Sequence, residues 1–367
     1  MKATRLLDAL PVSTPFVGPE RLMRESGRPD LVRLGANESA FGPSPRAVEA
    51  MSAELGRLSW YGDPDSYALR EALAAKHGCA VEQIVVGSGI DDLMGLAVRG
   101  FVEIGGVAVA ARGTYPTFAY HVAGYGGRLE TAPYTNEGEP DLDALASLAQ
   151  RVRPSVVYLA NPDNPSGSFI KRARVARFYE SLPPGALLLL DEAYADFADE
   201  GTLLEPHFDD RLVRVRTFSK AYGLAGARIG YALTTRRNAE HFEKIRLQYG
   251  VNRNAQIGAL AALQDRAYLE WVVRETAAAR NAYEALAREL GTTSIPSLAN
   301  FVCIDMGDAQ RATRVTQALL QRGVWIRKPG APPLDRYIRV STGTAPMREA
   351  FARALRVVLD EVPAAAP

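Results

Sequence analysis

The sequence predicts an α/β protein with a large three-layer α/β/α domain around a mostly parallel sheet and a smaller α+β domain beside it. Short apolar runs alternate with helical patterns through the middle of the chain, as when helices cover both faces of a sheet. These runs are apolar almost without interruption, as expected of strands buried on both faces. A chain of 367 residues is also too long for most single cores.

Six segments are predicted to be strands: residues 83–89, 107–113, 155–162, 186–194, 212–219 and 229–235. Helical patterns follow some of them, at 91–103 and 171–182. Another helix is predicted at 66–78, with Ser66 as its N-cap and Gly78 as its stop signal.

The pattern changes near residue 253. A long helical stretch at 255–291 precedes three short strands and a final helix, at 300–306, 323–328, 337–341 and 346–362. We interpret residues 46–252 as the large domain. Residues 253–367 are predicted to form the smaller domain, together with residues 1–45, which are too poor in periodicity to stand alone.

Composition excludes several classes of protein. The net charge is +1, from 43 Lys and Arg against 42 Asp and Glu, which gives no support to nucleic-acid binding or to an anionic membrane surface. The longest aliphatic run, 187–190, is far too short to span a bilayer. The two cysteines and four histidines lack metal-site spacing, so no metal is expected. Asp8 and Pro11 interrupt any signal-peptide core, and the chain reads as cytoplasmic.

Polar or glycine-rich clusters follow five of the predicted strands. Because functional groups gather at the carboxyl ends of strands in open α/β sheets, these clusters are expected to converge. They lie at residues 87–92, 114–118, 161–167, 191–194 and 217–220.

The Gly-Ser-Gly turn at 87–89 has two interpretations. It can be structural, because tight strand-to-helix turns often need glycine. It can also cradle an anion, because backbone N–H groups and the helix dipole face the turn. Asp92 replaces the third glycine of a dinucleotide fingerprint, so a Rossmann-type oxidoreductase accounts for this turn but not for Lys220, Arg228 and Asp191 together.

Combined, the five clusters describe one ligand. They provide a phosphate cradle, a flat aromatic ring, a carboxylate at Asp191 and an amine at Lys220. Pyridoxal 5′-phosphate fits each of these groups, since a lysine can form a Schiff base with its carbonyl carbon and an aspartate can keep its ring nitrogen protonated. A non-catalytic cofactor-binding protein would also account for these groups.

Three ordered motifs carry a family resemblance: TFSKAYGLAGARIGY, LLLLDEAYADF and NPDNPSG. The chain resembles the fold-type I pyridoxal-phosphate-dependent aminotransferases of class I and II from residue 34 to residue 343. Within that group, LGANE, YGDPDSYALREALA and NPDNPSG are most similar to the histidinol-phosphate aminotransferases.

The resemblance implies a role for each matching residue. Lys220 would form the Schiff base with the cofactor and later shuttle the proton of the reaction. Asp191 would pair with the pyridine nitrogen of the cofactor, and Tyr194 and Asn164 would form hydrogen bonds to its 3′-oxygen. Phe118 falls where the family places the aromatic that stacks on the ring. The phosphate site would consist of Gly89, Ile90, Asp91, Thr217, Ser219 and Arg228. Tyr61 resembles a tyrosine that reaches the phosphate of the neighbouring subunit, which implies a homodimer.

The resemblance leaves the amino donor open. Arg339 matches the arginine that grips the substrate carboxylate, and Asn37 of LGANES is a second substrate-binding candidate. Arg327 falls where histidinol-phosphate aminotransferases bind the substrate phosphate, but it can equally be an exposed strand-end arginine. Phe16 stands where those enzymes commonly have a tyrosine. Histidinol phosphate with 2-oxoglutarate as acceptor is therefore expected, and an aromatic or other non-phosphorylated amino acid is the alternative donor.

Overall fold

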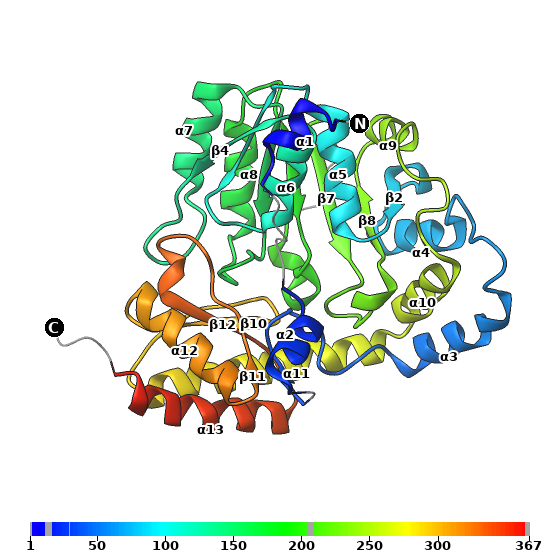
Figure 1. Ribbon diagram of the computed structural model, residues 1–367. Helices are drawn as coiled ribbons and strands as arrows, with labels where there is room; N and C mark the ends of the chain where they lie inside the picture. The colour runs from blue at the N-terminus through cyan, green and yellow to red at the C-terminus, as the bar shows by residue number, and fades with distance from the viewer. Residues whose placement is uncertain (1, 12–16, 29, 205–207, 364–367) are drawn as a thin grey trace.

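The structure is a computed structural model that describes residues 2–11, 17–28, 30–204 and 208–363. Its larger body is built on a seven-stranded sheet with strand order β2-β8-β7-β6-β5-β3-β4 (Figure 1). The strands are β2 (Ile84–Gly87), β3 (Val107–Ala111), β4 (Arg128–Ala132), β5 (Val156–Ala160), β6 (Leu187–Asp191), β7 (Leu212–Thr217) and β8 (Gly230–Leu233). β8 runs antiparallel to both β2 and β7, and the other neighbours are parallel.

Helices cover both faces of this sheet. One face packs on α5 (Ile90–Phe101), α6 (Pro116–Gly124) and α9 (Arg236–Glu243), and the other on α7 (Leu142–Val152) and α8 (Arg172–Ser181). Neighbouring residues of one strand face opposite cores: Tyr158 points to the α5–α6 side and Leu159 to the α7–α8 side. Both faces of the sheet are thus buried, and the predicted three-layer α/β fold is confirmed.

All six predicted strands are present. β4 was not predicted because its RLETA sequence is mostly polar and carries no apolar run. Helix α4 (Tyr67–His77) ends at Gly78, whose φ is +62°. Ser66 stands at the N-cap, but its side chain makes no capping bond; Asp63 accepts the Tyr67 N–H at 2.7 Å instead.

The smaller body has an antiparallel sheet of β9 (Ser294–Ile295), β10 (Phe301–Asp305) and β12 (Tyr337–Ser341) in the order β12-β10-β9. A parallel pair joins β1 (Val32–Arg33) to β11 (Val324–Trp325). Its core lies between these strands and the helices α11 (Arg266–Glu289), α12 (Ala309–Gln321) and α13 (Ala345–Glu361). Helix α2 (Pro19–Ser26) lies in front of α11 (Figure 1).

Two helices that the sequence assigns to the smaller domain lie on the larger body. Helix α10 (Arg253–Gln264), which the sequence assigns to the smaller domain, packs its alanines on α3 (Pro45–Ala53), α4 and β8 in the core of the larger body. Helix α1 (Arg5–Ala9), predicted to belong to the smaller domain, lies at the far end of the larger body (Figure 1). By contrast, Leu34 is completely buried in the core of the smaller body. The described parts of the N-terminal segment are therefore divided between the two bodies.

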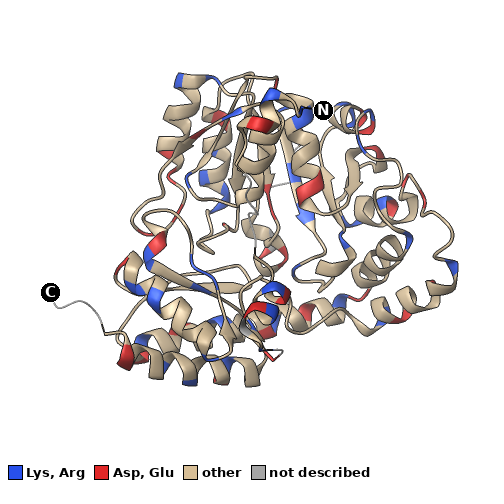
Figure 2. Ribbon diagram, viewed as in Figure 1, with Lys and Arg blue, Asp and Glu red and all other residues tan. Residues whose placement is uncertain are grey.

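Charge is mixed over the molecule: basic and acidic residues are interspersed over both bodies (Figure 2). Within the part of the chain that the structure describes, none of the helices combines the length and apolarity that a membrane span requires.

Candidate active site

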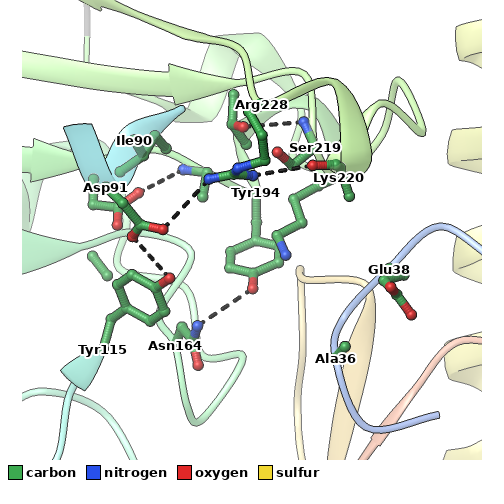
Figure 3. A pocket seen from close by; sticks show the side chains of 15 residues that line it. Ala36, Glu38, Ile90, Asp91, Tyr115, Asn164, Tyr194, Ser219, Lys220 and Arg228 are labelled. Carbon is green, nitrogen blue, oxygen red and sulfur yellow. Dashed lines mark hydrogen bonds and ion pairs between the residues drawn. The ribbon is translucent and has the colours of Figure 1, made fainter. Parts of the chain in front are cut away.

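A cavity of about 240 Å³ lies where β5, β6 and β7 end, and it brings most of the predicted residues together (Figure 3). The predicted residues that line it are Ile90, Asp91, Asn164, Asp191, Tyr194, Thr217, Ser219, Lys220 and Arg228. They come from five separate segments of the chain. The convergence of the strand ends is thereby confirmed.

Asp191 is the last residue of β6 and is 4% exposed. Its Oδ1 accepts the Ala193 N–H at 2.9 Å, and its Oδ2 accepts the Tyr158 hydroxyl at 2.6 Å. Burial raises the pKa of Asp191 to about 6, although both hydrogen bonds and the nearby Lys220 act to lower that pKa. The site therefore contains a carboxylate that gains from a cationic partner in the cavity.

The neighbouring carboxylate, Glu192, does not line the cavity. It is buried between Arg214 and Arg216, with ion-pair distances of 2.8 and 2.9 Å. These two arginines hold the pKa of Glu192 below its usual range despite its burial. Removing Glu192 would leave two buried guanidinium groups without the carboxylate that they share, which is costly. The cluster ties β6 to β7 directly below the residues that line the cavity.

Lys220 follows β7 and extends into the cavity, where its Nζ donates to the Asn37 carbonyl at 3.1 Å. Burial, and then the charge of Arg339, lower the pKa of Lys220 to about 8. Since the free amine is the nucleophilic form, a lowered pKa makes Lys220 a competent nucleophile and base near neutral pH. Asn37 has φ of +55°, an uncommon conformation that aims its carbonyl at this amine.

Tyr194 and Asn164 lie side by side opposite Lys220 (Figure 3). The Tyr194 oxygen accepts from Asn37 Nδ2 at 3.0 Å and from Asn164 Nδ2 at 3.4 Å. Its own proton is left to donate toward the cavity. Burial raises the pKa of Tyr194 to about 12, so this proton is retained at neutral pH.

The turn before α5 faces Arg228. Gly89 is the N-cap of α5 with φ of +89°, and a Cβ there would lie 2.8 Å from Arg228 Nη2. Arg228 pairs with Asp91 Oδ2 at 3.5 Å. The Ser219 N–H donates to Thr217 Oγ1 at 3.0 Å, which closes the turn on the other side. A helix N-terminus, a guanidinium and two hydroxyls therefore line one part of the cavity, an arrangement that suits an anion.

The prediction that Phe118 stacks on the cofactor is wrong. Phe118 is completely buried under α6 and stacks on Tyr158, with ring centroids 4.7 Å apart and an angle of 17°. Tyr115, at the N-cap of α6, lines the cavity instead, and its hydroxyl donates to Asp91 Oδ1 at 2.9 Å. The segment 114–118 was correctly identified, but α6 turns its third residue, Phe118, into the core.

A second cavity of about 280 Å³ shares Lys220, Tyr194, Asn164 and Tyr115 with the first and adds the substrate candidates Asn37, Arg327 and Arg339. Arg339 Nη1 donates to Asn164 Oδ1 at 2.7 Å, while its buried Nε has no hydrogen-bond partner among the described residues. Arg327 lies opposite Arg339 in an antiparallel bridge. It donates to the Val17 carbonyl at 3.0 Å, and burial together with Arg339 lowers its pKa to about 10.

Two predicted residues stand apart. Tyr61 is 77% exposed, stacks on Tyr249 at 4.5 Å, and does not line either cavity. Phe16 lies outside the described residues. Sequence reasoning missed Tyr115, Glu38 and Tyr158, of which the first two line the cavity. Tyr115 could have been found, since it is the aromatic nearest the end of its strand.

Comparison with known proteins agrees with this geometry. The family model for aminotransferase class I and II matches residues 29–355. Histidinol-phosphate aminotransferase of Moorella thermoacetica is 34% identical over 351 residues, covering 93% of this chain and 88% of the relative. Histidinol-phosphate aminotransferase 2 of Methylococcus capsulatus is 38% identical over 347 residues, covering 92% and 93%.

A solved structure is also similar. The crystal structure of histidinol-phosphate aminotransferase from Sinorhizobium meliloti in complex with pyridoxal-5′-phosphate matches with a TM-score of 0.95 and 42% sequence identity. The match covers 99% of this chain and 98% of that chain.

Proposed function

The chain belongs to the class I and II aminotransferases, and from this premise we propose that it transfers the amino group of histidinol phosphate to 2-oxoglutarate, with pyridoxal 5′-phosphate as its cofactor. The relatives named above, which are called histidinol-phosphate aminotransferases, support this donor. The reaction belongs to histidine biosynthesis. We place the protein in the cytoplasm, which accords with its two free thiols.

The residues of the first cavity fit the cofactor. The turn at Gly89 and Ile90, with Arg228, Thr217 and Ser219, suits a phosphate dianion. Asp191 offers a carboxylate to a protonated ring nitrogen, Tyr194 offers a proton to the 3′-oxygen, and the face of Tyr115 suits the ring. When bound, the cofactor supplies an electron sink at the substrate Cα.

The protein's own groups then have distinct tasks. Lys220 holds the cofactor, and its amine, once released, accepts the Cα proton and returns it. Asn164 links the two cavities, since its Nδ2 donates to Tyr194 and its Oδ1 accepts from Arg339. Lys220 is half-buried and lines both cavities, so its amine can reach the cofactor and the substrate from one position.

The pair Arg327 and Arg339 is the observation that carries the choice of donor. Both guanidinium groups line the cavity that opens onto Lys220. Histidinol phosphate brings a phosphate dianion, and 2-oxoglutarate brings two carboxylates, so each substrate carries two negative charges for two arginines. The buried Nε of Arg339 has no hydrogen-bond partner among the described residues, so this arginine keeps an unused donor for an anion.

An amino acid without a phosphate is the second candidate donor. Its single carboxylate needs only one arginine, and Arg339 alone would suffice. Arg327 is already engaged, because it donates to the Val17 carbonyl and lies over the Trp325 ring at 5.5 Å. This engagement favours a structural role for Arg327 and is the reason to keep the alternative.

Arg327→Ala separates the two candidates. With the donor alone, in a single turnover followed by the change in cofactor absorption, we expect the rate with histidinol phosphate to fall about 100-fold, the effect of one charge-assisted hydrogen bond pair. The rate with phenylalanine should change less than about threefold, since a rim interaction contributes little. Arg336→Ala is the matched control, because Arg336 pairs with Asp305 and lines neither cavity. Equal losses for both donors would support the alternative.

We also propose that the protein works as a homodimer in which Tyr61 completes the phosphate site of the other subunit. Tyr61 is too exposed to serve its own cavity, and it lies among further exposed apolar residues, namely Leu55, Leu58, Trp60, Leu247 and Tyr249. An apolar patch of this kind is typical of a protein interface.

A further inference from the structure

Tyr158 is a buried tyrosine whose hydroxyl points at Asp191. It lies in β5, opposite Leu189 of β6, and on the same face of the sheet as Asp191 two residues further along. The side chain is 1% exposed, and the distance from its oxygen to Asp191 Oδ2 is 2.6 Å. Such a short O–H···O⁻ contact is typical of a strong, charge-assisted hydrogen bond.

Phe118 fixes the position of this hydroxyl. Its ring lies parallel to the Tyr158 ring, with centroids 4.7 Å apart, and both are completely enclosed by the core on the α5–α6 side of the sheet. In close-packed surroundings the Tyr158 ring has little freedom to tilt. Phe118 therefore does not line the cavity but packs behind Tyr158, which in turn donates to Asp191.

We propose that Tyr158 is a positioning residue that keeps Asp191 ionised and directed into the cavity, and that Phe118 holds Tyr158 in place for this task. With Tyr158 on Oδ2 and the Ala193 N–H on Oδ1, each carboxylate oxygen has one donor from behind. The remaining lone pairs face the cavity, where a protonated ring nitrogen can bond to them. This proposal rests on the cofactor and not on the amino donor.

The balance of forces on Asp191 explains why such a donor is needed. Burial alone favours the neutral acid and raises the pKa of Asp191, whereas the Tyr158 hydrogen bond opposes that shift. Burial and the charge of Asp191 raise the pKa of Tyr158 well above 10, so the tyrosine keeps its proton and stays a donor. A neutral Asp191 could not stabilise a protonated ring nitrogen, and cofactor binding would weaken.

The test is the pH dependence of cofactor affinity, measured by titrating the apoenzyme of each variant with pyridoxal phosphate between about pH 5 and pH 9. In Tyr158→Phe, which removes only the hydroxyl oxygen, the pH below which affinity is lost should rise by about one unit or more, since a hydrogen bond to a charged group accounts for a shift of that size. The absorption of bound cofactor should change at the same pH.

Tyr134→Phe is the matched control. Tyr134 is equally buried and donates to another buried carboxylate, Asp163 Oδ1, at 3.0 Å, but it does not contact Asp191. Its pH profile should coincide with that of the wild type; titration of the cofactor phosphate is common to all variants and cancels. A Tyr158→Phe profile that coincides with the wild type, or an equal shift in Tyr134→Phe, would overturn the proposal.

Phe118→Leu gives a second measurement if Tyr158→Phe does not fold. This variant keeps the hydroxyl but loosens the ring that carries it, so a smaller shift in the same direction is expected. An unshifted profile in a folded Phe118→Leu protein would then count against the proposal. Because no amino donor is present in these titrations, their outcome is independent of the donor assignment.

Discussion

The surroundings of Lys220 favour its neutral amine over its charged ammonium form. Its ammonium form would lie near the guanidinium groups of Arg339 and Arg228 in a buried cavity, and both burial and this repulsion favour the neutral amine. A fraction of the apoenzyme therefore carries the reactive form near neutral pH, which an exposed lysine does not.

The apoenzyme should accordingly take up pyridoxal phosphate faster as pH rises. The pKa of Lys220 is lowered to about 8, so below that pH the rate should rise about tenfold per unit, and above it the rate should level off. Stopped-flow absorbance measures this rate. The control is Nα-acetyl-lysine in solution, whose side-chain amine should react with pyridoxal phosphate at a rate that keeps rising well beyond pH 9. A plateau absent up to pH 10 in the enzyme would contradict the lowered pKa.

Single residues also show where sequence reasoning reaches its limit. Lys220 and Asp191 were predictable because each stands at the end of an apolar strand, and strand ends converge by topology. Arg228 was predictable from the family motif that also contains Lys220. The choice between Tyr115 and Phe118 was not, because it depends on how α6 starts: Tyr115 remains at the cap while Phe118 points inward. Tyr158 gave no signal, since a tyrosine within an apolar run looks like core.

Among the elements, the junction of β2 and α5 has a steric requirement that bears directly on the cavity. Gly89 needs a positive φ, and its missing side chain leaves the space that Arg228 occupies. The proposed phosphate site therefore depends on the start of α5 and on the β7–β8 connection together.

Gly89→Ala should weaken pyridoxal phosphate binding about tenfold or more, because displacing Arg228 removes one charge-assisted bond to the phosphate. Gly105→Ala is the control: Gly105 has φ of +78° but open space around its Cβ position, so it has a comparable backbone strain and no displaced arginine. Both variants should lose stability in thermal unfolding, and only Gly89→Ala should lose affinity. Equal affinities would show that Arg228 adjusts freely.

Elements with strong periodicity were predictable, and those with polar faces were not. The strands β2, β5, β6 and β7 are buried throughout and appear as apolar runs. Helix α12 was missed because its polar and small residues outnumber the three that are buried, Ala312, Val315 and Leu319. The predicted long helix at 255–291 is two helices, since Asp265 ends α10 and caps α11 by accepting the Tyr268 N–H at 3.3 Å.

For the whole molecule, the proposal that two subunits share each active site can be tested by mixing subunits. Lys220→Ala should have no aminotransferase activity, and Tyr61→Ala should have little at limiting cofactor. When the two variants are unfolded and refolded together, a mixed dimer has one site with both native residues, so activity should return. Mixing each variant with itself is the control. Failure to recover activity, in a mixture that forms mixed dimers, would place Tyr61 outside the active site.

The β7–β8 connection also limits which molecules the protein can accept. It is closed at its base by the Thr217–Gly230 register, and it carries Lys220 near one end and Arg228 near the other. The amine and the guanidinium proposed to bind the phosphate therefore stand at opposite ends of one loop. An aldehyde without a phosphate would bind only at the Lys220 end, and one with a longer chain between aldehyde and phosphate would not reach both groups at once.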